Sequence, residues 1–294
     1  MRTSSIHSTR SPKRRYLSVR NGPFEHGSAS EELAETLGPL HNLRLVEPPV
    51  SDVDSPDQGL WLERATFAYN ELWVLRETDL HVPRGADLLV TGHNGVGKST
   101  FLFLCAGLLP ATSGRVLLDG RVPHVSTPSD LVRGGVRRGV LFDSGGLLSN
   151  LSALNNVTLA LRYHADVFGI DEQEIHRRAR DALTELRVAP TDFHALPAHL
   201  SLGVRKRVSL ARALVLEPNF VFFDDPDAGL DAPTRALVYK LLERFRDDPK
   251  ITMVVTSNSR PLIERMAVPI VELSHGHLLK KSGSQNPNSR GPSY

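Results

Sequence analysis

The chain has 294 residues, of which 40% are hydrophobic, and its formal net charge at pH 7 is +2. This length and composition suit one α/β domain with a sizeable core and flanking tails, and a charge so close to neutral predicts no nucleic-acid partner. The longest apolar run, residues 101–109, is far shorter than the ~20 residues of a membrane span, so we expect no crossing of a membrane by this chain alone.

Composition divides the chain into three parts. Residues 1–57 begin with a basic, serine-rich stretch and continue through a segment with Pro and Asp, which predicts a disordered basic arm and linker. A transit peptide has the same composition as the arm and is the alternative. Residues 58–282 carry the patterns of a folded domain, whereas residues 283–294 are rich in Ser, Gly, Pro and Asn and predict a disordered tail.

Two strands are expected at the start of the folded part, at residues 60–69 and 80–82. Their position ahead of a parallel core predicts an antiparallel β layer beside it. Tyr69 ends the first strand, where its ring could stack on an adenine base or could simply be half-buried at the strand end.

A phosphate-binding loop follows. An apolar strand is expected at residues 87–90 and a buried helix at residues 101–106, and the segment between them reads G-H-N-G-V-G-K-S-T, which fits G-x-x-x-x-G-K-[S/T]. Glycines let the backbone turn its N–H groups toward phosphate, Lys98 would reach the β- and γ-phosphates, and Ser99 would contact Mg²⁺. The predicted nucleotide-binding residues here are Gly92, His93, Asn94, Gly95, Val96, Gly97, Lys98, Ser99 and Thr100.

Further along, strands are expected at residues 113–120 and 140–142, and helices at residues 155–163 and 172–186. Asp143 directly follows the second of these strands. Ligands of open α/β sheets gather at the carboxyl ends of the strands, so Asp143 is a candidate site residue.

The last third contains the second acidic candidate. Ser201 is a good N-cap for a helix that reaches residue 216, and an apolar strand at residues 220–223 ends at Asp224 and Asp225. An acid at the end of a buried strand is where a P-loop fold holds its Mg²⁺-linked carboxylate. A helix at 233–245, a strand at 251–256 and a hairpin at 271–279 complete the pattern; His275 and His277 in the hairpin are interpreted as surface residues.

These motifs, in this order, resemble the ATP-binding subunit of an ABC transporter over residues 60–281. Gly92–Thr100 resembles the Walker A loop, Asp224 the Walker B aspartate, residues 200–204 the signature segment, residues 228–231 the D-loop and residues 142–148 the Q-loop. The resemblance implies a P-loop NTPase of the α/β class, with a parallel core sheet, an antiparallel β layer and a helical signature subdomain. It also implies ATP and Mg²⁺ as ligands and places Tyr69 at the adenine.

Four positions depart from the family pattern. Asp143 stands where the Q-loop has Gln, Asp225 where the family has its catalytic Glu, and Asn258 where it has the switch His; Leu202 replaces the first signature glycine. The resemblance implies catalytic roles for Asp225, Asn258 and Asp143, metal contacts for Ser99, Asp143 and Asp224, and nucleotide contacts for Ser201 and Gly203. Since Asp225 is one methylene shorter than Glu and Asn258 cannot be cationic, the expected ATPase activity is weak.

Within the family, residues 142–148 and 156–164 are most similar to Mla/MCE-type lipid-transport ATPases. This implies a peripheral subunit on the cytoplasmic face of the inner membrane. Its partners would be a transmembrane permease docked on residues 143–154, a second ATPase subunit in a homo- or heterodimer, and an MCE-type substrate-binding protein. The alternatives are a nucleotide-binding regulatory or structural subunit with little hydrolysis, motivated by the four departures, and a soluble ABC protein of translation or DNA repair.

Overall fold

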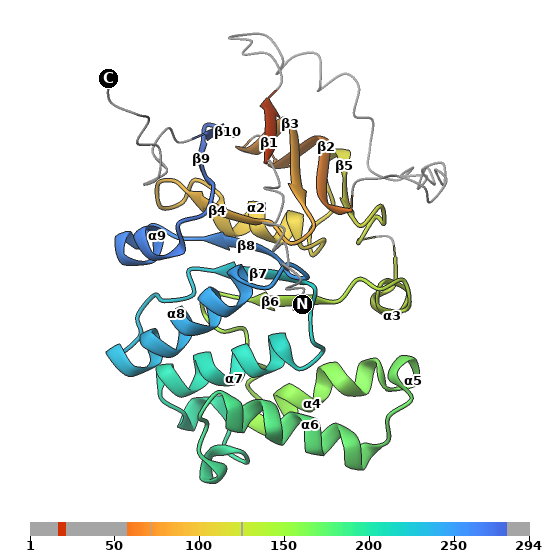
Figure 1. The fold of residues 1–294 in the computed structure, drawn as a ribbon, viewed down its shortest axis with the longest axis vertical. Helices are drawn as coiled ribbons and strands as arrows, with labels where there is room; N and C mark the ends of the chain where they lie inside the picture. Colours follow the sequence, from red (N-terminus) through yellow and green to blue (C-terminus); the bar gives the residue numbers. More distant parts are fainter. Residues whose placement is uncertain (1–16, 22–57, 71, 125, 281–294) are drawn as a thin grey trace, which may run out of the picture.

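The computed structural model describes residues 17–21, 58–70, 72–124 and 126–280. Its first layer is an antiparallel sheet with the strand order β1-β3-β2-β5 (Figure 1). The four strands are β1 (Ser18–Asn21), β2 (Gly59–Tyr69), β3 (Leu72–Pro83) and β5 (Ser113–Leu118). The antiparallel layer expected from sequence is therefore present. However, β3 is far longer than the expected residues 80–82, because its first half pairs with the end of β2.

β1 corrects the expectation of a disordered arm over all of residues 1–57. Residues 18–21 pair antiparallel with β3, from Ser18 opposite His81 to Asn21 opposite Thr78, and Arg20 faces Asp79. This strand covers an edge of β3 that would otherwise offer unpaired backbone groups. The rest of the predicted arm and the predicted tail at 283–294 lie outside the described residues.

The second layer is a six-stranded sheet with the order β10-β9-β4-β8-β7-β6, parallel except for β10. Its strands are β4 (Asp87–Thr91), β6 (Arg138–Leu141), β7 (Phe220–Asp224), β8 (Thr252–Thr256), β9 (Ile270–Ser274) and β10 (His277–Lys280). Every strand was expected from sequence, although β6 begins and ends earlier than the expected residues 140–142.

Helices fill both faces of this parallel sheet. α2 (Lys98–Cys105) lies between the two sheets, and the other helices lie on the far side or at the rim (Figure 1). These are α3 (Pro128–Arg133), α4 (Ala153–Tyr163), α5 (Ala165–Phe168), α6 (Glu172–Glu185), α7 (Leu202–Leu214), α8 (Ala232–Arg246) and α9 (Arg260–Met266), with short 3₁₀ turns at Pro190–Asp192 and Pro197–His199. The sequence had not indicated α3, α5 or α9. Among the described residues, no helix combines the length and the apolar character needed to cross a membrane.

The core has two parts, one on each face of the parallel sheet. In β7, Phe220 and Phe222 pack toward α2 and the antiparallel sheet, while Val221 and Phe223 pack toward the helices of the opposite face. All residues of β7 are buried, as expected for a central parallel strand covered on both sides. The uninterrupted apolar run before Asp224 therefore follows from the position of the strand.

The strand register brings the carboxyl ends of four neighbouring strands to one edge. Thr256 of β8 lies opposite Val90 of β4 and Asp224 of β7, and Leu141 of β6 lies opposite Phe223. Residues that directly follow these strands are consequently neighbours in space, although they are up to 166 positions apart in sequence. The fold of the chain is thus a mixed α/β architecture with its polar loops gathered at this edge.

Candidate nucleotide-binding and catalytic site

The loop between β4 and α2 has the backbone that its glycines predict. Gly97 caps α2 with a φ of 104°, and a Cβ atom there would lie 2.4 Å from Cγ1 of Val74. Lys98 is 7% exposed, and its Nζ donates hydrogen bonds to the carbonyls of Gly92 (3.0 Å) and His93 (3.3 Å). The ammonium group of Lys98 therefore lies inside the turn of the loop. A phosphate group bound by this loop would have its negative charge next to that cation.

Asp224 ends β7 with a carboxylate that is 2% exposed. The hydroxyl of Thr256, on the neighbouring strand β8, donates to its Oδ1 over 2.5 Å. A buried acid is costly unless it is hydrogen-bonded, and Thr256 supplies part of that compensation. Asp224 is therefore held in one orientation next to the loop that carries Lys98.

Asp225 has an unusual backbone for a residue that is not glycine, with a φ of 37°, and its N–H donates to the carbonyl of Thr256 (3.0 Å). Strained backbone of this kind concentrates at functional sites. Burial and repulsion from Asp224 raise the pKa of Asp225 above its usual value, against the opposing effects of Lys98 and a hydrogen bond from Ser257. A raised pKa makes a carboxylate a stronger base, which suits a proton acceptor.

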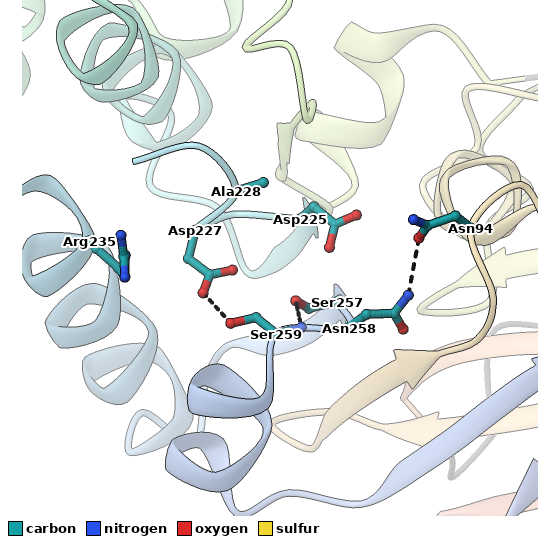
Figure 2. Close-up of a pocket in the computed structure, with 8 residues that line it drawn as sticks. All are labelled: Asn94, Asp225, Asp227, Ala228, Arg235, Ser257, Asn258 and Ser259. Atoms are coloured by element: carbon teal, nitrogen blue, oxygen red, sulfur yellow. Dashed lines mark hydrogen bonds between the residues drawn. The ribbon is translucent and has the colours of Figure 1, made fainter. Parts of the chain in front are cut away.

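Asn258 is bonded to the phosphate loop through both ends of its amide. Its Nδ2 donates to the carbonyl of Gly92 (2.7 Å) and to Oδ1 of Asn94 (3.3 Å), while its Oδ1 accepts from the N–H of Gly92 (3.2 Å). Figure 2 shows the contact with Asn94. An amide offers a donor and an acceptor side by side, and a single imidazole cannot match both groups of one residue in this way. Asn258 thus connects the segment after β8 to the phosphate loop through hydrogen bonds.

A cavity of about 300 Å³ opens beside these groups (Figure 2). It is lined by Asn94, Asp225, Asp227, Ala228, Arg235, Ser257, Asn258 and Ser259. Asp227 is 7% exposed and accepts hydrogen bonds from the Tyr239 hydroxyl (2.8 Å) and the Ser259 hydroxyl (2.6 Å). These bonds link the loop after β7, helix α8 and the loop after β8 around the cavity.

The donor set fits Mg²⁺ only in company with a nucleotide. Among the described residues, no group of three or more His, Cys, Asp or Glu side chains could hold a metal ion. Mg²⁺ in phosphoryl-transfer sites takes one or two protein ligands and completes its shell with phosphate oxygens and water. Asp224 and Ser99 are the ligands predicted for that mode, and their metal contacts, like that of Asp143, stay predictions.

Comparison with known proteins gives the family. The family profile described as ABC transporter matches residues 75–228. This chain belongs to the ABC transporter ATP-binding family. It is 32% identical over 222 residues to an uncharacterised ABC transporter ATP-binding protein of Sinorhizobium fredii, y4fO, covering 76% of this chain and 62% of that one. It is 39% identical to the taurine import ATP-binding protein TauB of Burkholderia pseudomallei, over 58% of this chain and 61% of that one.

Among solved structures, the dimeric ATP-binding cassette MJ0796 bound to ADP and Pi is similar with a TM-score of 0.68 and 25% identity, covering 77% of this chain and 99% of that one. The fold is therefore that of an ABC ATPase cassette, with a parallel core sheet and an antiparallel layer as predicted. The chain spans about three fifths of the length of the curated relatives named above, 62% and 61%.

Of the predicted site residues of this ABC cassette, Asn94, Asp225 and Asn258 line the cavity, whereas Tyr69, Ser201 and Gly203 make other contacts. Tyr69 is 51% exposed and meets the edge of Phe67 at the tip of the β2–β3 hairpin. Ser201 caps α7 by accepting from the N–H of Val204 (3.3 Å), and Gly203 lies so close to Thr234 that a Cβ atom would be 2.9 Å from its hydroxyl. The structure leaves the predicted nucleotide contacts of Tyr69, Ser201 and Gly203 as predictions.

Lys206 of α7 is a further residue near the site, is 2% exposed and was not predicted from the sequence. A run of three basic residues at 205–207 is typical of a solvent-exposed helix face. However, Lys206 lies four and seven positions before Leu210 and Ala213, which places all three on the buried face of α7. This helical spacing is the sequence pattern that could have indicated that Lys206 is buried. Burial lowers the pKa of Lys206, and the attraction of four carboxylates opposes this effect. The four are Asp143, Asp224, Asp225 and Asp227.

Proposed function

We propose that this ABC cassette binds and hydrolyses ATP, and that it couples this cycle to a separate membrane permease. The observation that carries the proposal is the meeting of Lys98, Asp224 and Asp225 at the carboxyl ends of β4 and β7, beside β8. One cation for phosphate, one buried acid for the metal and one strained acid with a raised pKa are the parts that phosphoryl transfer to water requires.

In this proposal each group has one task. Lys98 binds the β- and γ-phosphates, and Asp224 with Ser99 would hold Mg²⁺, which neutralises developing phosphate charge. Asp225 accepts a proton from water as the water oxygen attacks the γ-phosphorus and the bond to the β–γ bridging oxygen breaks, releasing ADP. Asn258 positions Gly92 and Asn94 through its three hydrogen bonds. Its proposed catalytic task is to donate a hydrogen bond to the γ-phosphate from this position.

The test of Asp225 is its amide variant. We expect Asp225→Asn to lower kcat for ATP at least about 100-fold, because the proton acceptor is lost, while the Kd for Mg-ATP changes less than about threefold. Phosphate release and fluorescent-nucleotide titration measure the two quantities. Asp181→Asn, at an exposed position of α6, is the matched control and should leave both unchanged. Turnover that survives Asp225→Asn would remove Asp225 from this role.

A nucleotide-binding regulatory subunit with little turnover is the second candidate. It is motivated by the four departures from the family pattern, among them the shorter acid at Asp225 and Asn258, whose amide is hydrogen-bonded to the loop. This candidate predicts normal Mg-ATP affinity without phosphate release, with or without a permease. Robust hydrolysis by the purified chain would eliminate it.

The proposal extends to the location of the subunit and to its assembly with a second cassette. We infer a peripheral subunit on the cytoplasmic face of the inner membrane, in which Ser201 and Gly203 of one cassette face the nucleotide of a second cassette. Support comes from the exposure of this region, where Leu202 is 43% exposed. Asp225→Asn should sediment as a dimer with Mg-ATP and as a monomer without it; a monomer under both conditions would contradict the assembly.

For the cargo we propose phospholipid, with an MCE-type substrate-binding protein as a further partner, on the resemblance of residues 142–148 and 156–164 to lipid-transport ATPases. Affinity purification of the tagged chain from native membranes tests this. Recovery of a permease with an MCE-type protein and bound phospholipid is the expected result. Recovery of a permease with a periplasmic binding protein for a small polar solute would replace the lipid assignment.

A further inference from the structure

Lys206 of α7 is a buried cation whose every donor is used. Its Nζ donates to the carbonyl of Asp143 over 3.0 Å, to that of Asp225 over 3.2 Å and to that of Phe142 over 3.4 Å. An ammonium group carries three donors and no acceptor, so these three carbonyls satisfy it completely. The lysine makes these bonds from a position that is 2% exposed, where water cannot replace them.

The three carbonyls belong to two different loops of the site. Phe142 and Asp143 follow β6, and Asp225 follows β7, so the two loops begin at the carboxyl ends of adjacent strands. Lys206 therefore joins three segments at one atom, namely the loop after β6, the loop after β7 and helix α7. The bond to Asp225 goes to the residue whose backbone is in the left-handed region, with a φ of 37°, which needs outside support to persist.

The charge of Lys206 also matches its surroundings. Asp143, Asp224, Asp225 and Asp227 all attract it, and Asp225 is also attracted by Lys98. A neutral side chain of the same length would remove one hydrogen bond from each of the three carbonyls, although those of Phe142 and Asp225 also accept from the N–H groups of Gly145 (2.9 Å) and Ala228 (3.2 Å). It would also remove the cation that attracts all four carboxylates. Both losses act on the position of Asp225, because it contributes one of the carbonyls and one of the carboxylates.

The same face of α7 holds the rest of the loop after β6. Arg212, six positions after Lys206, donates to the carbonyls of Gly146 (2.7 Å) and Gly145 (3.2 Å). Ser209 lies between them, and a Cβ atom at Gly145 would be 2.8 Å from its Oγ. Residues 142–146 are thus tied along two turns of α7, with Lys206 at the end nearest the proposed proton acceptor.

We propose that Lys206 is a positioning residue for ATP hydrolysis, which fixes the backbone of Asp225 and of residues 142–143 relative to helix α7. It lies outside the nucleotide-binding loop and contacts the cavity lining only at the backbone carbonyl of Asp225. Its effect is on where Asp225 stands when water attacks. The proposal rests on the hydrolytic function proposed above.

The test separates positioning from binding. We expect Lys206→Met to lower kcat for ATP at least about tenfold, because displacement of a reacting group by about 1 Å can cost up to 100-fold, while the Kd for Mg-ATP stays within about threefold of the wild type. Lys206→Arg keeps a cation with donors and should recover most of the lost kcat. Lys240→Met, at an exposed site on α8, is the matched control and should change neither quantity.

Hydrogen exchange gives a readout that does not need turnover. In Lys206→Met we expect faster amide exchange in residues 142–146 and in residues 225–228 together, and unchanged exchange in residues 92–100. Equal kcat and equal exchange in the wild type and Lys206→Met would overturn the proposal. If the wild type itself releases no phosphate, the hydrolytic function fails, and unchanged exchange in the two loops would still overturn the positioning role independently.

If Lys206→Met also loses ATP affinity, the Lys206→Arg variant decides whether Lys206 has the proposed positioning role. An arginine variant that binds ATP normally and recovers kcat supports the positioning role. An arginine variant that binds normally with kcat still reduced at least tenfold contradicts it, because a cation with donors would then be insufficient.

Discussion

At the scale of single residues, two aspartates at opposite ends of the parallel sheet differ in their hydrogen bonding. Asp224 at the carboxyl end has a hydroxyl partner in Thr256. Asp87 begins β4 at the other end, and its Oδ1 is buried with no hydrogen-bond partner among the residues that the structure describes. Burial raises the pKa of Asp87 from 3.8 to about 7, although Arg246 attracts it. The first acid belongs to the site, whereas the second lowers stability.

This difference predicts a pH effect on folding. A carboxyl whose folded-state pKa is raised favours the protonated form, so its contribution to the free energy of unfolding falls as pH rises from about 4 to about 7 and is constant above that. Asp87→Asn removes this dependence. The variant should therefore gain stability relative to the wild type between pH 5 and pH 8, by on the order of 2–4 kcal/mol at ~1.4 kcal/mol per pKa unit. Urea unfolding at both pH values measures it; an equal difference at pH 5 and pH 8 would contradict the account.

A second residue-scale prediction concerns the phosphate loop. Gly97→Ala would force a Cβ atom to within 2.4 Å of Val74 Cγ1 and would strain a φ of 104°. We expect it to weaken Mg-ATP binding at least about 100-fold, since strain of ~1–3 kcal/mol and a clash with a buried side chain add together. Gly120→Ala has a positive φ of 75° but open space around it, so it should cost stability only. Nucleotide titration of both variants shows whether the loss of Mg-ATP affinity is specific to Gly97 or follows from backbone strain at any glycine with a positive φ.

At the scale of elements, local signals place helix ends well. Ser152, Asp171, Ser201 and Asp231 each accept a hydrogen bond from the N–H three residues later and begin α4, α6, α7 and α8. Such a cap satisfies one of the unpaired donors of the first turn. The pattern was readable in the sequence because cap and donor are neighbours in the chain.

The cap of α7 supports a prediction of its own. Ser201→Ala should lower the free energy of unfolding by about 1 kcal/mol, because the N–H of Val204 loses its acceptor. Ser201→Thr keeps an acceptor and should lose less. Thermal unfolding of the two variants makes the comparison, and equal Tm values would show that the hydroxyl does not stabilise the helix.

At the scale of the whole molecule, the candidate site lies at one of the two sheets, and the other sheet covers the core. The parallel sheet carries Lys98, Asp224, Asp225 and Asn258 at its edge, while the antiparallel sheet packs over α2 and receives β1 from the N-terminal part of the chain. β1 contributes no residue to the cavity lining. The antiparallel edge and the site are therefore separable.

Deletion of residues 1–21 tests that separation. Loss of the β1–β3 pairing should lower stability by roughly 1–2 kcal/mol, about 2–8 °C in Tm, and leave the Kd for Mg-ATP unchanged. The uncovered edge of β3 should also promote association at high protein concentration, visible by light scattering. A large loss of ATP affinity would mean that the antiparallel sheet is coupled to the site.

The sequence by itself determined the parts whose atoms are close along the chain. The phosphate loop with Lys98, the strand that ends at Asp224 and the Ser201 cap of α7 each follow from a short contiguous pattern. With the order of the other motifs they were enough to indicate the ABC cassette. Asp224 and Asp225 could be singled out as candidate site residues because a buried apolar strand rarely ends in two charged side chains for packing reasons alone.

The tertiary structure alone decided the contacts between distant segments. Asn258 meets Gly92 across 166 positions, Lys206 meets Asp143 across 63, and Asp227 meets Ser259 across 32, since the parallel register places these strand ends side by side. β1 reaches β3 in the same manner. Local patterns report which face of an element is buried, but they do not report which loop it is buried against, because that depends on the order of strands in the sheet. For this reason the phosphate loop could be predicted from the sequence, whereas Lys206, for which we propose a positioning role, could not.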